Sequence, residues 1–195
     1  HISDEMLSRF KSQEKFCPQF HLSLQSGSDG VLKRMNRHYD SAFYEDLVTR
    51  IRNIFPDSAI STDIMVGFPG ETEEEFQESL EFAKKIGFAK AHVFAYSRRK
   101  GTVADKMNGQ IPNSIKHERS KKMIAATCES EEKFLKSLVG KELSVLFETE
   151  EKGKWVGYTK NYARVEVKSE ENLAGALMNV KITSAKGEYC EGEII

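Results

Sequence analysis

Apolar residues dominate one short segment of the chain, and on either side of it they recur at helical spacing. In this segment, residues 58–66, both faces of a predicted strand are apolar, as in a strand that is covered on both sides. Gly67 and Gly70 end the strand, and Thr72 with Glu75 forms the Thr-x-x-Glu capping box of the next helix. In α/β folds, ligands bind at such a junction, against the backbone amides of a helix start.

The other segments of the first 139 residues alternate between helix and strand patterns. Two further strands are predicted at 20–25 and 89–96, and apolar spacing predicts longer helices at 3–16, 41–55, 73–86 and 113–137. Helices that alternate with strands in this order favour a parallel sheet with crossover helices. The predicted fold class is α/β, either part of a TIM-type barrel or half of a doubly wound sheet.

The pattern changes at Gly140, where residues that favour strands become dominant. Strand patterns at 143–148, 155–158, 163–167 and 177–183, separated by turn residues, indicate about five short strands. Such a run of strands is typical of a small β-barrel of the OB type. We therefore predict two domains: residues 1–139, with a linker helix at their end, and a β-barrel at residues 140–195.

Composition narrows the classes of protein to which the chain can belong. The sequence has 29 Lys plus Arg and 30 Asp plus Glu, so it lacks the overall basic charge of a simple nucleic-acid-binding module. No apolar run is long enough to span a membrane, and the first residues lack the pattern of a signal peptide. Cys17, Cys128 and Cys190 form neither a disulfide framework nor a metal motif, which favours a reducing, cytoplasmic location.

Polar clusters follow the three predicted strands of the first domain. They are Gln25 to Ser28, Thr62 and Asp63 with the glycine turn, and Tyr96 with Ser97. In a parallel barrel these strand ends share one face, so they can surround one ligand. Gln25 and Ser26 would bind a ribose or an amino acid, and Met65 with Val66 would form an apolar wall. The same residues are also compatible with ordinary strand-to-helix turns.

Several charged and aromatic residues have two open interpretations. Asp63 lies in an apolar run and needs a partner, for which Arg37 is a candidate, whereas His21 favours a core position. The basic loop residues are either solvated or bind phosphate, and the aromatic residues of the barrel either stack on bases or fill its core. These residues are Arg98, Arg99, Lys100, Trp155, Tyr158, Tyr162 and Arg164. No nucleophile–base pair and no set of zinc ligands is recognisable, so no catalytic or metal-binding residue is assigned.

Four motifs resemble the radical S-adenosylmethionine (SAM) methylthiotransferases, and residues 140–195 resemble their TRAM domain. The motifs are His21-Leu-Ser-Leu-Gln-Ser-Gly-Ser28, Arg34-Met-Asn-Arg37, Thr62-Asp-Ile-Met-Val-Gly-Phe-Pro-Gly-Glu-Thr72 and Tyr96-Ser-x-Arg-x-Gly-Thr102. Within the family, Ser23, the Met35-Asn36-Arg37 run and Gly157-Tyr-Thr-Lys-Asn-Tyr162 look most like the branch that acts on N6-threonylcarbamoyladenosine at position 37 of tRNA. The branches that act on isopentenyladenosine or on a ribosomal protein are alternatives.

The resemblance implies a partial TIM-type barrel and a chemistry carried by cofactors. In the family, a [4Fe-4S] cluster and SAM generate a radical that activates C2 of the adenine, and a second cluster serves the insertion of sulfur. By family position, the residues near SAM are Gln25, Ser26, Asp63, Met65, Val66, Gly67, Phe94 and Tyr96. The predicted tRNA-binding residues are Arg37, Arg98, Arg99, Lys100, Tyr158, Lys160, Tyr162 and Arg164.

The family's Cys-x-x-x-Cys-x-x-Cys motif does not occur in this sequence. The chain therefore resembles the C-terminal part of such an enzyme, and we expect it to bind no cluster and to be inactive by itself. Residues 140–195 contain eight Lys plus Arg and ten Asp plus Glu, a balance that weakens the expectation of tRNA binding by the barrel. A non-enzymatic RNA-binding module is the competing interpretation, and the oligomeric state is not predicted.

Overall fold

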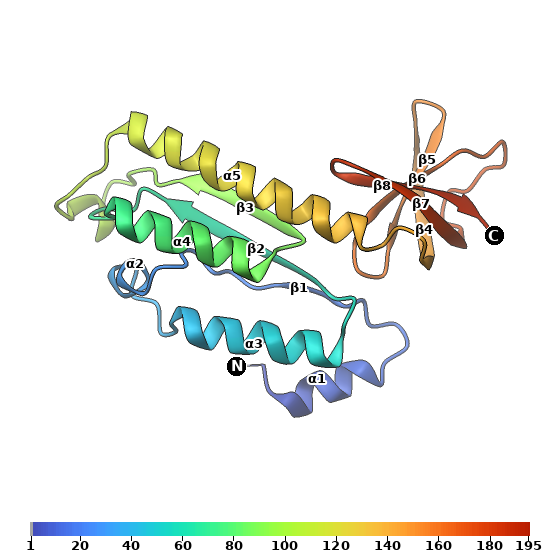
Figure 1. Ribbon diagram of the computed structural model, residues 1–195, viewed down its shortest axis with the longest axis horizontal. Helices are drawn as coiled ribbons and strands as arrows, with labels where there is room; N and C mark the ends of the chain where they lie inside the picture. Colours follow the sequence, from blue (N-terminus) through green and yellow to red (C-terminus); the bar gives the residue numbers. More distant parts are fainter. Residues whose placement is uncertain (1) are drawn as a thin grey trace.

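The chain folds into a three-stranded sheet backed by helices and, after a long helix, a closed five-stranded β-barrel (Figure 1). This is a computed structural model that describes residues 2–195. His1, with which the first predicted domain begins, lies outside the described residues. Both predicted architectures, the parallel α/β layer and the small barrel, are confirmed.

The sheet is parallel, in the strand order β1-β2-β3. Its strands are β1 (Gln19–His21), β2 (Ala59–Val66) and β3 (Lys90–Ala95). β2 lies in the centre, with His21 opposite Ser61 on one side and Val66 opposite Ala95 on the other. All three strands therefore end at the same edge of the sheet, where the polar clusters of the sequence follow them.

The helices are α1 (Asp4–Lys11), α2 (Asp29–Arg34), α3 (Ser41–Ile54), α4 (Glu73–Ile86) and α5 (Asn113–Lys136), with a 3₁₀ turn at Ala104–Lys106. The helices α3, α4 and α5 begin and end close to the residues that the sequence indicates. The Asp40 side chain caps α3, and the Thr72–Glu75 capping box forms at the start of α4. Gly87 ends α4 in the left-handed conformation that favours glycine.

One face of the sheet is covered and the other is open. Helices α3, α4 and α5 supply Ile51, Phe76 and Met123 to a core that also holds Ile60 and Ile64 of β2. Successive residues of a strand point to opposite faces, so the alternate residues of β2 and β3 lie on the uncovered side. Phe94, for example, is half exposed there.

The barrel has its own core. Its strands pair in the order β4-β5-β6-β8-β7, and β7 closes the ring on β4. Phe147, Val165 and Val180 are fully buried inside it. The strands are β4 (Glu142–Glu151), β5 (Lys154–Thr159), β6 (Arg164–Val167), β7 (Leu177–Lys186) and β8 (Tyr189–Ile194). The fifth strand, β8, had no range of its own in the sequence pattern.

Helix α5 joins the two parts. Met123 belongs to the core under the sheet, whereas Leu135, near the other end of α5, belongs to the core of the barrel. The barrel also contacts the loop before β2: Lys141 Nζ lies 2.6 Å from Asp57 Oδ1, and Asn161 Nδ2 donates a hydrogen bond to the backbone oxygen of Asp57.

Two predicted elements are shorter in the structure. Helix α1 ends at Lys11, after which two successive turns bring Phe16 back to stack on Phe10, with ring centroids 4.8 Å apart. Strand β1 ends at His21 rather than near residue 25, because side chains replace the ladder there: Thr62 Oγ1 donates to the oxygen of Leu22 and accepts from the amide of Leu24.

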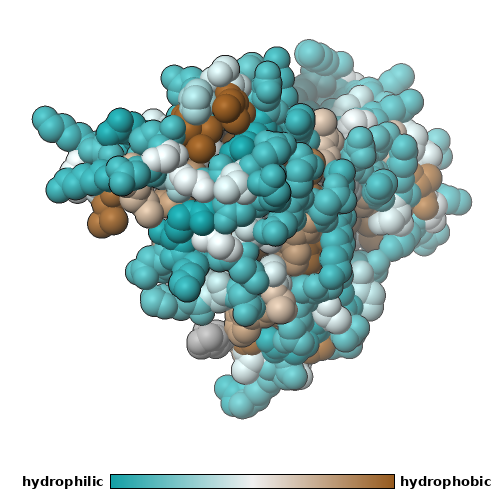
Figure 2. Space-filling model, turned by 60° about the vertical axis from the view of Figure 1, so that its left-hand side comes forward, coloured by the Kyte–Doolittle hydropathy of each residue, from teal (hydrophilic) through white to brown (hydrophobic). Residues whose placement is uncertain are grey.

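Figure 2 shows a largely hydrophilic surface with small, separate apolar groups at the end of the molecule where α5 begins. No described helix is long and apolar enough to cross a membrane.

Candidate functional site

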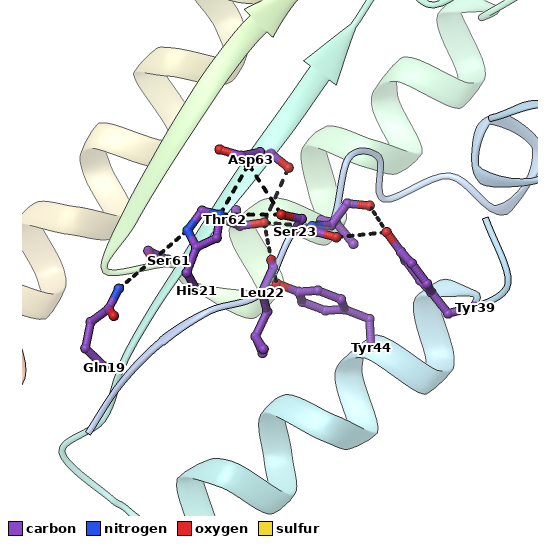
Figure 3. Close-up of polar contacts among 10 residues, drawn as sticks. Gln19, His21, Leu22, Ser23, Tyr39, Tyr44, Ser61, Thr62 and Asp63 are labelled. Carbon is purple, nitrogen blue, oxygen red and sulfur yellow. Dashed lines mark hydrogen bonds and ion pairs between the residues drawn. The ribbon is translucent and has the colours of Figure 1, made fainter. Parts of the chain in front are cut away.

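The open face of the sheet carries a connected series of polar side chains (Figure 3). Gln19 Nε2 donates to Ser61 Oγ at 2.7 Å, and Ser61 Oγ lies 3.1 Å from His21 Nδ1. On its other side, His21 Nε2 lies 3.2 Å from Asp63 Oδ2, and Ser23 Oγ donates to the same carboxylate oxygen at 3.3 Å. Both contacts of the His21 ring are hydrogen bonds when Nε2–H donates to Asp63 and Nδ1 accepts from the hydroxyl of Ser61.

This arrangement corrects two predictions. Within the described residues, the basic side chain that lies beside Asp63 is His21, not Arg37. His21 is not a core residue, because its side chain is 43% exposed on the open face. The sequence alone could not distinguish the faces, because the strand that carries His21 ends after only three residues.

The segment after His21 is held in place by hydroxyl groups of α3 and of the loop before it. Tyr44 Oη donates to the backbone oxygen of Leu22, and Tyr39 Oη donates to those of Ser23 and Leu24 (Figure 3). Burial raises the pKa of both tyrosines, so both hydroxyls remain donors over the physiological pH range. These bonds aim the segment at the carboxyl end of β2.

Gln25 completes this segment in a strained backbone conformation. Its φ of 69° lies in the left-handed region, which costs a residue other than glycine or asparagine about 1–3 kcal/mol. The conformation is fixed from both sides, since the amide of Gln25 donates to the oxygen of Asp63 and its oxygen accepts from the amide of Met65. Such strain is concentrated at functional sites.

A cavity of about 590 Å³ opens beside Gln25, at the carboxyl ends of β2 and β3. Met65 and Phe94 give it apolar walls. Tyr96, which also lines it, is 7% exposed, and its hydroxyl has no hydrogen-bond partner within residues 2–195. The polar lining residues are Gln25, Asp63, Ser97, Arg99 and Thr102. An apolar wall with several hydrogen-bonding groups around it fits an adenosyl group.

Three residues expected in this site face elsewhere. Val66 belongs to the core on the helix side of the sheet, because it alternates with Met65 along β2. Ser26 is fully buried, and its Oγ accepts the amide hydrogen of Ser28. The amide of Gly67 donates to the buried carboxylate of Glu71 rather than facing the cavity.

Residues of α5 support the site, although no pattern in the sequence pointed to them. Arg119 Nη1 lies 2.7 Å from Glu71 Oε2, and both side chains are almost fully buried. Burial raises the pKa of Glu71, and the donors around its carboxylate oppose that rise. Lys116 Nζ donates to the backbone oxygen of Tyr96 at 2.9 Å. In the sequence these cations are part of a polar helix run that is typical of a solvated face.

The basic loop after β3 separates its charges. Arg98 binds the carboxylate and the backbone oxygen of Asp105, whereas Arg99 lines the cavity beside Gln25. Lys100 is exposed, and Arg37 is exposed at the end of α2. Of the cations expected at this end of the sheet, Arg98 is therefore engaged within the protein, whereas Arg37, Arg99 and Lys100 are available to a ligand.

On the barrel, Tyr158 and Tyr162 lie together at the surface, whereas the third aromatic residue, Trp155, is buried in the barrel core. The rings of Tyr158 and Tyr162 are 6.4 Å apart, and Tyr162 is 64% exposed. They line a groove of about 890 Å³ with Leu146 and Leu177. Two of the predicted cations are engaged within the protein: Lys160 donates to the backbone oxygen of Glu14, and Arg164 binds Glu151 and Glu166.

No metal-binding group is formed by the described part of the chain. Residues 2–195 contain no cluster of three His, Cys, Asp or Glu side chains that could hold a metal ion. Cys17 and Cys128 are exposed, and Cys190 is buried in the barrel core. These residues do not fit an iron–sulfur cluster, which requires several thiolates around one position.

Comparison with known families matches both parts of the fold. Residues 1–83 match the Radical SAM superfamily, and residues 136–195 match the TRAM domain. The solved structure of coproporphyrinogen III oxidase (HemN) from Escherichia coli, described as a radical SAM enzyme, superposes with a TM-score of 0.56 at 21% identity. The match covers 67% of this chain and 30% of HemN, and at this identity it shows similarity of fold only.

Curated proteins of higher identity match along the whole chain. "tRNA-2-methylthio-N(6)-dimethylallyladenosine synthase" of Clostridium perfringens (strain 13 / Type A) is 42% identical over all of this chain, which spans 44% of the length of that relative. The protein of the same name from Clostridium beijerinckii is 46% identical over 93% of this chain and 40% of its own length. "Threonylcarbamoyladenosine tRNA methylthiotransferase MtaB" of Bacillus subtilis (strain 168) is 37% identical over the whole chain and 44% of its own length.

Proposed function

Because the chain belongs to the radical SAM methylthiotransferases that carry a TRAM domain, we propose that it forms the cofactor wall and tRNA-binding barrel of a tRNA-modifying enzyme. The proposed reaction adds a methylthio group to C2 of N6-threonylcarbamoyladenosine at position 37 of tRNA. The observation that supports it best is the cavity beside the strained residue Gln25, where the three parallel strands end.

The residues of this cavity have separate proposed tasks. Met65 and Phe94 would hold an adenine ring between apolar surfaces, and Gln25 with Ser97 and Thr102 would bind the polar parts of SAM. Reductive cleavage of bound SAM supplies the radical that this chemistry requires. Asp63 would act as a positioning residue, because its carboxylate is already oriented by His21 and Ser23.

The proposed cluster ligands lie outside this sequence, since it contains no Cys-x-x-x-Cys-x-x-Cys motif. We therefore propose that the 195-residue chain alone is inactive, and that activity belongs to a complete enzyme that contains it. Assay of iron and sulfide in the purified chain after anaerobic reconstitution tests this. Stoichiometric iron and sulfide bound to the chain would contradict it.

The dimethylallyladenosine branch is a second candidate, since several of the similar relatives carry that name. The two branches differ in the nucleoside that they produce. Nucleosides from tRNA of a host strain that lacks its own methylthiotransferases and expresses the complete enzyme can be identified by liquid chromatography and mass spectrometry. We expect 2-methylthio-N6-threonylcarbamoyladenosine; the isopentenyl product supports the second candidate, and neither product would overturn the proposed reaction.

A variant pair connects this assay to the cavity. Phe94→Ala removes an apolar wall and should reduce product formation at limiting SAM more than at saturating SAM. Phe43→Ala, at a partly exposed position on α3 outside the cavity, is the matched control. Equal loss in both variants would argue against the proposed role of Phe94.

An RNA-binding module without enzymatic activity is the remaining candidate, and the exposed Tyr158–Tyr162 pair favours it. Titration of the purified chain with tRNA across salt concentrations tests this role. Binding through the phosphate backbone weakens steeply with salt, so a steep salt dependence would support contacts to the tRNA backbone. Tight binding by the chain, together with an inactive complete enzyme, would favour the module.

A further inference from the structure

A second cavity, of about 540 Å³, adjoins the first at the carboxyl end of the sheet. The two share Gln25, Met65 and Ala104 in their linings. The second cavity is lined on its apolar side by Met35, Met65, Phe68, Val103 and Met107, so we call it the methionine pocket. Methionine side chains adapt to ligands of irregular shape, which suits a pocket for a flexible substituent.

The end of α2 gives this pocket its polar rim. Asn36 adopts a left-handed conformation, with φ of 57°, which asparagine tolerates. Its amide donates to the oxygen of Lys33, and the amide of Arg37 donates to the oxygen of Leu32, the two bonds of a Schellman motif. This turn brings Met35 and Arg37, from either side of Asn36, to the same pocket.

The rim carries positive charge that the protein leaves uncompensated. Lys33 and Arg37 line the pocket, are exposed, and have no ion-pair partner within residues 2–195. Arg34, between them, is instead held by the carboxylate of Glu75. No aspartate or glutamate lines the pocket. An apolar floor with free cations at its rim fits an organic group that ends in a carboxylate.

We propose that the methionine pocket binds the substituent on N6 of the target adenine, and that Arg37, assisted by Lys33, pairs with a carboxylate on that substituent. This inference rests on the proposed function. C2 must lie beside the first cavity if SAM binds there, and N6 is attached to the same six-membered ring as C2. The substituent therefore extends into space next to the first cavity, and the methionine pocket occupies such a space.

The proposal makes Arg37 a specificity-determining residue. A threonylcarbamoyl group carries a carboxylate, whereas a dimethylallyl group is neutral and apolar. A site built to bind a charged group discriminates strongly against an analogue that lacks it, because its own polar groups are then left unpaired. The methionines contact either substituent, but only the carboxylate gains from Arg37.

The methionines themselves provide the readout. Met35, Met65 and Met107 line the pocket, whereas Met6 lies on α1, Met123 in the core under the sheet and Met178 on the barrel. The experiment labels the methyl groups of the purified chain with ¹³C and titrates it with N6-threonylcarbamoyladenosine nucleoside. We expect shifts of the three pocket signals, with the other three unchanged.

Matched ligands and variants test the charge. The methyl ester of the nucleoside and N6-isopentenyladenosine should each bind at least tenfold more weakly than the free acid. Arg37→Gln should weaken binding of the acid at least tenfold and leave binding of the ester unchanged. Arg9→Gln is the control, because Arg9 belongs to an exposed ion pair with Glu5 on α1. An unchanged Met123 signal shows that each variant is folded.

Each outcome decides the proposal. No shift of the pocket signals at millimolar nucleoside, or equal binding of acid and ester, would overturn it. Tighter binding of the isopentenyl nucleoside would overturn the role of Arg37. If the proposed function is wrong but the pocket proposal is right, the pocket binds the acid while the complete enzyme makes no methylthiolated nucleoside. A complete enzyme that makes the threonylcarbamoyl product without pocket shifts refutes the pocket alone.

Discussion

Lys116 Nζ donates a hydrogen bond to the backbone oxygen of Tyr96 while the stem of the same side chain covers Gly67. A Cβ atom added at Gly67 would lie 2.3 Å from Lys116 Cγ. Because Gly67 follows β2 and Tyr96 follows β3, one side chain of α5 holds the ends of two strands together. The candidate cofactor cavity lies at these same strand ends.

The contact predicts that Gly67→Ala destabilises the fold by about 2–5 kcal/mol. Two causes add: a φ of 72° disfavours alanine by about 1–2 kcal/mol, and the new methyl group overlaps Lys116, which costs about 1–3 kcal/mol. Gly101→Ala is the control, since Gly101 has a φ of 90° with open space around its Cβ position. Urea denaturation should show the larger loss for Gly67→Ala, and Lys116→Ala added to Gly67→Ala should recover part of it. Equal losses at both glycines would refute the overlap.

The ion pair of Glu75 with Arg34 should make the free energy of unfolding depend on pH. The hydrogen bonds from Arg34 lower the pKa of the Glu75 carboxyl below the usual value of a glutamate. A lowered pKa in the folded state contributes stability that is present above the unfolded pKa and is lost as the pH falls through the folded pKa. Glu75→Gln should therefore cost about 1 kcal/mol at pH 7, and the difference from wild type should shrink below pH 4.5. Glu81→Gln, an exposed change on the same helix, is the control; a difference that does not change with pH would contradict the assignment.

The hydrogen bond of Asn161 to Asp57 is expected to stabilise the contact between the barrel and the sheet. The side chain of Asn161 is 5% exposed and donates to the backbone oxygen of Asp57, so Asn161→Ala removes a hydrogen bond between the barrel and the loop before β2. We expect a loss of about 1–3 kcal/mol and faster hydrogen exchange at residues 55–59, without loss of either core. Asn179→Ala, at an exposed position on β7, should change neither quantity. Unchanged exchange at residues 55–59 in Asn161→Ala would show that the contact is dispensable.

The cysteines should differ in reactivity. Burial raises the pKa of the Cys190 thiol to about 11, whereas Cys17 and Cys128 are exposed. Only the thiolate is nucleophilic, so iodoacetamide at pH 8 should alkylate Cys17 and Cys128 first and Cys190 only after denaturation. Peptide mass spectrometry over time measures the order. Rapid labelling of Cys190 in the native chain would show that the barrel core opens readily.

Local signals explain why the helices were predictable. The limits of α4 follow from Thr72, Glu75 and Gly87, which act within a single turn of the chain. Strand β2 was also predictable as a strand, but the expectation that both of its faces are covered was wrong, because helices pack on one face only. In contrast, the shortened β1 depends on hydroxyl groups from Thr62, Tyr39 and Tyr44, whose bonds form only in the folded chain.

The site was predictable only in part, for a similar reason. Sequence placed Gln25, Asp63 and Met65 near one another, and the structure brings all three to one cavity. It could not assign the alternation of β2, so Val66 was expected beside Met65 and lies in the core instead. Partners that are distant in sequence were missed altogether: His21 for Asp63, and Arg119 for Glu71.

The shared helix α5 has a consequence for how such chains can vary. Met123 is packed under the sheet and Leu135 inside the barrel, and the helix between them is unbroken. Each residue of an α-helix advances the axis by about 1.5 Å and turns it by about 100°. Deletion of one residue between these positions would thus rotate the barrel by about a quarter turn around the axis of α5. The Tyr158–Tyr162 surface would then face a different direction from the one it now has relative to the strand ends. The number of residues in this stretch of α5 therefore sets the direction in which the barrel presents its surface.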